Sequence, residues 1–131
     1  MAVQNRKAAR TDLAQRITTA VTALQAFYSY APKDVSGQSP VGWLESLSLP
    51  APRSAEENRF AFAVVFVVDR ADAGAAEDLL DDIAYQFQTM AEGINGLVIT
   101  QPSATDIIEG DNQTGQWRTE VFQVEYLYEG A

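Results

Sequence analysis

The chain has 131 residues, 47% of them apolar, which suits one domain with a substantial core and is too short for two ordinary domains. It contains no cysteine and no histidine, so no disulfide, no Ser–His–Asp or Cys–His site and no ordinary zinc site can be built from it. The net charge of −9 is made of +2 in residues 1–70 and −11 in residues 71–131, a balance that argues against direct binding of nucleic acid.

The uneven distribution of charge has two readings. Either the acidic residues only keep the chain soluble, or the basic and acidic halves of the sequence meet across an interface between subunits. The lack of cysteine is typical of a protein made in the cytoplasm. The longest apolar run, Phe60 to Val68, is too short for a transmembrane helix, so we expect a buried strand there and no membrane association.

The sequence begins with a polar segment and continues with an amphipathic helix. Residues 1–10 are predicted to form a flexible arm. From Thr11 or Asp12, either of which can cap a helix, apolar residues recur at helical spacing, and Pro32 should stop the helix. The apolar stripe consists of Leu13, Ile17, Ala20, Val21, Leu24, Phe27 and Tyr28.

Residues 31–59 are punctuated by proline and glycine and predict a long loop or hairpin that becomes ordered against a partner. A strand over 41–49 is expected within it, with Trp43, Leu47 and Leu49 on one face, while Leu44 breaks the alternation. We expect Trp43 at a contact between subunits, because aromatic residues are enriched in interface cores. The alternative, a covered edge strand of the same domain, stays open.

Residues 58–69 form the clearest strand of the sequence. Its large side chains alternate with small ones, which predicts a central strand with helices on the bulky face. A helix should follow over 72–92, where apolar residues again recur at helical spacing. Three acids lie opposite its apolar stripe and are expected on a solvated surface, not in an active site: Asp78, Asp81 and Asp82.

Two strands should finish the chain, one over 97–108 with an interruption at Pro102 and one over 116–128, joined by the polar turn 109–115. The predicted fold class is α+β, with a mainly antiparallel sheet of four to five strands and two helices packed on one face. The elements follow the order α-β-β-α-β-β, with room for one more strand in 28–50, and the whole chain forms a single domain.

The acidic segment before the last strand comes closest to a metal site. Asp106, Glu109, Asp111 and Asn112 carry the oxygen ligands that Mg²⁺ and Ca²⁺ prefer, but their spacing does not match an EF-hand loop. Ordinary turn preferences of Asp, Asn and Gly explain the same residues. We therefore predict no metal site, no cofactor and no enzymatic activity, and we expect Trp117 in the core.

The order of these elements resembles the tail terminator proteins of long-tailed bacteriophages, the group of the lambda-type minor tail protein U. The resemblance rests on the amphipathic helix, the apolar strand 59–68, the helix in 72–92, and Gly115-x-Trp117 leading into the alternating strand 121–128. It implies a hexameric ring that caps the tail tube, stops its polymerisation and joins the tail to the head-completion or neck proteins. It also implies a virion protein with no catalytic residues, through whose lumen the DNA passes.

If the protein forms such a ring, we expect tube-facing contacts in 41–49 and 53–59. Ring contacts are expected between 106–112 and basic residues near Arg10, Arg16 or Arg59, because neighbours in a cyclic ring touch through two different patches. The interface residues expected on these grounds are Trp43, Leu44, Leu47, Leu49, Arg53, Arg59, Asp106, Glu109, Asp111 and Asn112.

Three alternatives to the terminator remain open. Another phage neck or tail-completion ring protein has the same size and element order. An NTF2-like domain that binds a small molecule would need three or more long strands after the last helix. A ferredoxin-like dimeric regulatory module would need a strand before the first helix.

Overall fold

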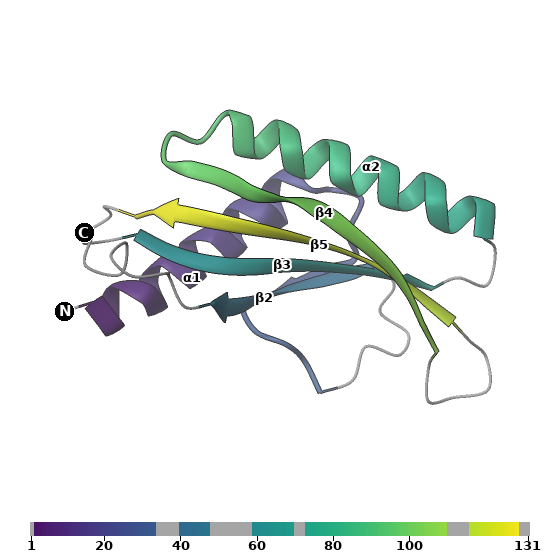
Figure 1. Cartoon of the computed structure of the whole chain (residues 1–131), viewed down its shortest axis with the longest axis horizontal. Coiled ribbons are helices and arrows are strands. Elements are labelled where there is room, and N and C mark those ends of the chain that lie inside the picture. The colour runs from purple at the N-terminus through teal and green to yellow at the C-terminus, as the bar shows by residue number, and fades with distance from the viewer. Residues whose placement is uncertain (1, 34–39, 48–58, 70–72, 110–115, 129–131) are drawn as a thin grey trace.

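The computed structural model describes residues 2–33, 40–47, 59–69, 73–109 and 116–128; for 2–5, 73, 101–109 and 116–117 it describes the backbone only. The elements are α1 (Ala2–Ala20), β1 (Ala26–Tyr28), β2 (Val41–Leu47), β3 (Arg59–Asp69), α2 (Ala73–Glu92), β4 (Leu97–Glu109) and β5 (Gln116–Leu127) (Figure 1). The strands form one sheet in the order β1-β2-β3-β5-β4, in which only β1 and β2 run parallel. The predicted α+β fold is confirmed, and the sheet has five strands; the additional strand, β1, lies at Ala26–Tyr28 and overlaps the expected range 28–50 only at Tyr28.

Strand β3 is the centre of the sheet. Every residue from Arg59 to Asp69 pairs with β5, and seven of them also pair with β2. Its bulky side chains belong to one buried cluster with side chains of α1, α2, β4 and β5, as the alternation of large and small residues predicted. Phe66 lies at the middle of this core, with ring centroids 5.6 Å from Phe87 of α2 and 6.1 Å from Phe122 of β5.

The prediction of a flexible arm over residues 1–10 is wrong for Ala2 to Arg10, which form the first turns of α1. Ala9 is completely buried, one helical turn before the equally buried Leu13 and Ile17. The segment looks polar in the sequence because Arg6, Lys7 and Arg10 surround Ala9, and these three side chains are half-buried or exposed while Ala9 is buried. A single alanine at the right spacing is a weak sequence signal, but it is enough to continue the packed stripe.

The first helix also ends earlier than its apolar stripe predicted. α1 stops at Ala20, and the residues expected to continue it form β1, which pairs with β2. The Gln25 backbone N–H donates to the Pro40 carbonyl at 2.8 Å and brings the chain beside β2. Leu24 and Phe27 nevertheless pack on the core, so burial continues although the helix does not.

Strand β2 lies inside the sheet, between β1 and β3. The part of 31–59 that the structure describes as a strand therefore belongs to the domain itself, as the alternative to a partner-ordered loop proposed, but it is an inner strand and not the edge strand that this alternative expected. Leu44, which broke the expected alternation, faces the helices and is only 1% exposed. Trp43 faces the other side, next to Tyr28 and Val65 in the register.

Strand β4 is an edge of the sheet and continues past Pro102 to Glu109. Its pairing with β5 shifts register between Ile99 and Gln101 and again between Gln101 and Ala104. Proline has no N–H to donate, and an edge strand next to an irregularity is where it is tolerated. The predicted interruption is therefore a change of register rather than the end of the strand, and residues 106–109 of the segment expected to make ring contacts belong to β4.

Both helices lie on the same face of the sheet. α1 contacts β1 and β2, and α2 contacts β3 and β4, so each helix covers one half of that face (Figure 1). The outer side of α2 carries Asp78, Asp81 and Asp82, all exposed, which confirms their expected position on a solvated surface.

We predict that Gly42→Ala destabilises the fold. A Cβ at this position would lie 2.7 Å from the Val65 carbonyl oxygen and 2.8 Å from the Phe27 ring, and the backbone contact cannot give way. The expected loss is about 1–3 kcal/mol in the free energy of unfolding, measured by urea denaturation. Gly93→Ala is the matched control, because its Cβ would make only an ordinary contact at 3.5 Å. An unchanged urea midpoint for Gly42→Ala would contradict the close packing of β1 on β2.

Candidate functional site

The face of the sheet away from the helices carries a second, smaller apolar cluster. It consists of buried Val41, Val65 and Val67, with Ala26, Tyr28, Trp43 and Val121 packed around them. No helix residue contributes to this cluster among the residues that the structure describes. We call this side of the sheet the second sheet face.

The aromatic residues at the rim of the second sheet face are half-buried. Tyr28 and Trp43 sit side by side on β1 and β2, over the three valines. The Trp43 indole N–H donates to the Glu45 carboxylate at 2.9 Å, two residues along the same strand. One edge of the tryptophan thus packs on apolar side chains while its polar end reaches an exposed acid, an arrangement that aromatic residues adopt at interfaces.

A charged pair lies on the same face, near the other end of β3. The Arg59 guanidinium is 3.7 Å from the Glu125 carboxylate, and only 22% and 11% of the two side chains are exposed. Arg59 and Glu125 sit diagonally across the β3–β5 pairing, where side chains of one face meet. The second sheet face therefore combines an aromatic-rimmed cluster with a partly buried ion pair.

The structure brings three of the ten predicted interface residues to this face: Trp43, Leu47 and Arg59. The prediction for Leu44 is wrong, because its side chain lies in the core beneath the helices and cannot reach a partner. Asp106 and Glu109 belong to β4, where their backbones pair with Thr119 and Gln116. The remaining four lie outside the described residues: Leu49, Arg53, Asp111 and Asn112.

Each of the three arginines expected near ring contacts already has a partner within the chain. Arg10 donates to the Ser46 hydroxyl at 2.8 Å, Arg16 to the Asp12 carboxylate at 2.9 Å, and Arg59 lies beside Glu125. An intersubunit ion pair with one of them would have to compete with, or add to, these contacts. The contacts of Arg10 and Arg16 are exposed and contribute little to stability, so they do not prevent an intersubunit contact there, whereas the Arg59–Glu125 pair is partly buried.

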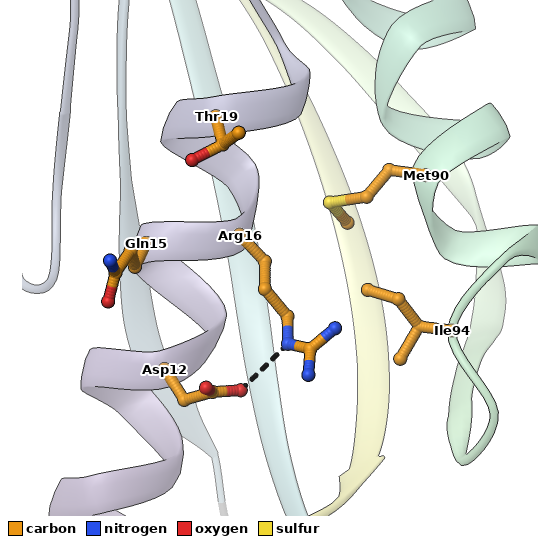
Figure 2. A pocket seen from close by; sticks show the side chains of 6 residues that line it. All are labelled: Asp12, Gln15, Arg16, Thr19, Met90 and Ile94. Carbon is orange, nitrogen blue, oxygen red and sulfur yellow. Dashed lines mark hydrogen bonds and ion pairs between the residues drawn. The ribbon is translucent and has the colours of Figure 1, made fainter.

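A pocket of about 460 Å³ opens between α1 and the end of α2 (Figure 2). Its polar wall comes from α1 and its apolar wall from Met90 and Ile94. Figure 2 shows Arg16 reaching across from α1 toward Ile94, with its guanidinium bonded to Asp12. The lining residues are Asp12, Gln15, Arg16, Thr19, Met90 and Ile94.

Tyr126 of β5 connects this pocket to the sheet. Its hydroxyl donates to the same Asp12 carboxylate oxygen at 2.5 Å, so one carboxylate holds both Tyr126 and Arg16. Burial of the ring, and then the hydrogen bond to Asp12, raise the pKa of Tyr126 to about 12. The sequence predicts Asp12 only as a helix cap. The sequence feature that indicates the ion pair is the spacing of four residues between Asp12 and Arg16.

The Asp12–Arg16–Tyr126 network fits a structural link between α1 and β5 better than a catalytic group. The carboxylate is already shared between two donors, and the phenol stays protonated far above neutral pH. In the part of the chain that the structure describes, no three acidic side chains lie close enough together to hold a metal ion. No described helix is long and apolar enough to cross a membrane.

A scan against known protein families finds no model that matches this chain. A search of curated proteins likewise finds no significant relative. The function proposed below therefore depends on the residues and on the geometry of the sheet.

The Tyr126 network predicts a specific dependence of stability on pH. The folded-state pKa of about 12 lies above the ordinary value of 10.0, so the stabilisation is complete below pH 10 and is lost as the pH rises toward 12. Tyr126→Phe should cost about 1–3 kcal/mol at neutral pH and should lack this alkaline loss. Urea unfolding at pH 7 to 12 measures both effects. Tyr85→Phe, at a side chain that is 72% exposed, is the control and should match the wild type.

Proposed function

We propose that the protein is a structural ring protein of a long-tailed bacteriophage, and specifically the tail terminator that caps the tail tube. The observation that supports this most directly is the division of the sheet into two unlike faces. One face is covered by both helices, whereas the second carries an aromatic-rimmed cluster with an ion pair beside it. A small domain built in this way has a surface suited to a flat protein partner.

In this proposal the second sheet face contacts the last ring of the tail tube. Trp43 supplies the kind of large, half-buried aromatic that dominates binding energy in protein interfaces. The Arg59–Glu125 pair, toward the other end of β3 on the same face, adds electrostatic specificity, because partly desolvated charges discriminate between partners more than they add affinity. The head-completion or neck protein would bind on another side of the ring, with DNA passing through the lumen.

The alternatives differ in how well they fit the fold. Another neck or tail-completion ring protein would use the same two-faced sheet, and it is distinguished only by its partner. An NTF2-like domain would need three or more strands after the last helix, whereas two described strands, β4 and β5, follow α2. The pocket between the helices has the size of a small-molecule site, but its charged groups are already bonded to each other or to Tyr126.

We predict that the purified protein forms a closed ring. Light scattering should be measured across a range of protein concentrations, with and without millimolar Mg²⁺. It should show a monomer that converts to a single larger species, the ring, as the protein concentration or the Mg²⁺ concentration rises. Mg²⁺ is expected to favour the ring because it screens the excess of acidic residues. A mass that remains that of a monomer or dimer under every condition would contradict self-assembly and would favour the small-molecule alternative.

Trp43 provides the test of the tube contact. Tubes grown from the tail-tube protein of the same phage should stop lengthening when this protein is added, as seen by electron microscopy. Trp43→Ala should lose this effect, and Trp43→Phe, which keeps the aromatic packing, should retain most of it. Circular dichroism and urea unfolding of each variant separate a lost contact from a lost fold. A folded Trp43→Ala protein that still stops tube growth would contradict the proposed contact.

A further inference from the structure

The charge split in the sequence is also a split in space. Residues 1–70 build α1, β1, β2 and β3, and residues 71–131 build α2, β4 and β5. The sheet order β1-β2-β3-β5-β4 places these two groups on opposite sides of the domain. We call the side formed by α1 and the edge strand β1 the basic side, and the side formed by α2 and the edge strand β4 the acidic side.

The two helices carry opposite charge. α1 contains four basic residues and one acid, a net charge of +3, and its Lys7 and Arg16 are exposed. α2 contains five acids and no basic residue, a net charge of −5, and all five acids are exposed. The second half of the chain holds only one basic residue, Arg118, and its guanidinium lies 2.8 Å from Glu77 of α2. The acidic side therefore has little positive charge left to offer a neighbour.

The acidic side also contains an edge strand that pairs on one side only. Among the described residues, β4 pairs with β5 and with no other strand along its 13 residues. Val98, near its start, is 53% exposed. An edge of this length with an apolar side chain on its surface is a feature that proteins usually cover. A second copy of the chain can cover it only if the charges allow the approach.

We propose that copies of this chain associate head to tail, with the acidic side of one subunit against the basic side of the next. A two-fold contact through either side alone would bring like sides together, basic against basic or acidic against acidic, and would be repulsive. The head-to-tail contact joins opposite charges at every interface and leaves the second sheet face of each subunit free. The inference rests on the proposed ring, since a head-to-tail contact that closes is what generates a ring.

Charge reversal on the two sides tests the proposal. The acid-reversed variant carries Asp78→Lys, Asp81→Lys, Asp82→Lys and Glu92→Lys, which turns the net charge of α2 and β4 from −7 to +1. The base-reversed variant carries Arg6→Glu and Lys7→Glu, which turns that of α1 from +3 to −1. These residues lie on helix surfaces, so the variants are expected to fold, and circular dichroism checks this. Each variant alone has two sides of the same sign. Each should therefore assemble at least about tenfold more weakly than the wild type, because like charges at an interface are costly.

Two recoveries are specific to the head-to-tail contact. An equimolar mixture of the two variants should form rings again, with equal numbers of each variant by native mass spectrometry. A single chain that carries both reversals should assemble alone, and it serves as the matched control for all six substitutions. Sedimentation or light scattering gives the assembled fraction in every case.

The outcomes separate this inference from the proposed function. If the wild type assembles but neither single variant is weakened, or the mixture does not recover, the assignment of the contact to the acidic and basic sides is wrong and the ring stands. If the folded wild type never assembles, the self-assembling ring itself is wrong, and this contact falls with it. The proposed contact is supported if both single variants assemble more weakly than the wild type, and if assembly recovers both in the mixture and in the chain that carries both reversals.

Discussion

The position of β3 between β2 and β5 is the constraint on which the rest of this structure depends. In a strand paired on both sides, the backbone N–H and C=O groups are hydrogen-bonded within the sheet. Its side chains therefore determine what packs on each face. The phenylalanines and valines at even positions need a thick cover, and both helices supply it. Alanines and valines at odd positions leave room only for the shallow cluster around Trp43. The two unlike faces of the domain follow from this one alternation.

The same constraint explains why the first apolar stripe changes from helix to strand. The stripe from Leu13 onward must stay on the bulky face of β3, but a helix continued to Tyr28 would leave β2 without a partner on its outer side. The chain turns after Val21 and returns as β1, and Phe27 still packs on Phe66 with ring centroids 6.1 Å apart. Gly42 makes this approach possible because it has no side chain between Phe27 and β3.

Elements with a strong internal period were predictable from the sequence. The period of two in Arg59–Asp69 and the helical period in Ala73–Glu92 are local properties, and both predictions hold to within a residue or two. The predictions that failed depended on contacts between residues far apart in the sequence. β1 forms only with β2 as its pairing partner, and the first turns of α1 need a surface on which Ala9 can pack. The burial of Leu44 depends on which face of the sheet the helices cover. The shared use of Asp12 by Arg16 and Tyr126 likewise joins residues 114 positions apart, which no local pattern reveals.

The order of the strands in the sheet keeps the basic and acidic halves of the chain apart in the fold. Had β4 or β5 been inserted between β2 and β3, the acidic half would have been interleaved with the basic half, and the split in the sequence would have disappeared in the fold. Because β2 pairs with one side of β3 and β5 with the other, β4, β5 and α2 stay together on one side. Such a separation does little for the stability of the domain, since exposed charges contribute weakly to folding. It acts at long range, where it orients one molecule toward another before they touch, and so selects between contacts that bury similar surfaces.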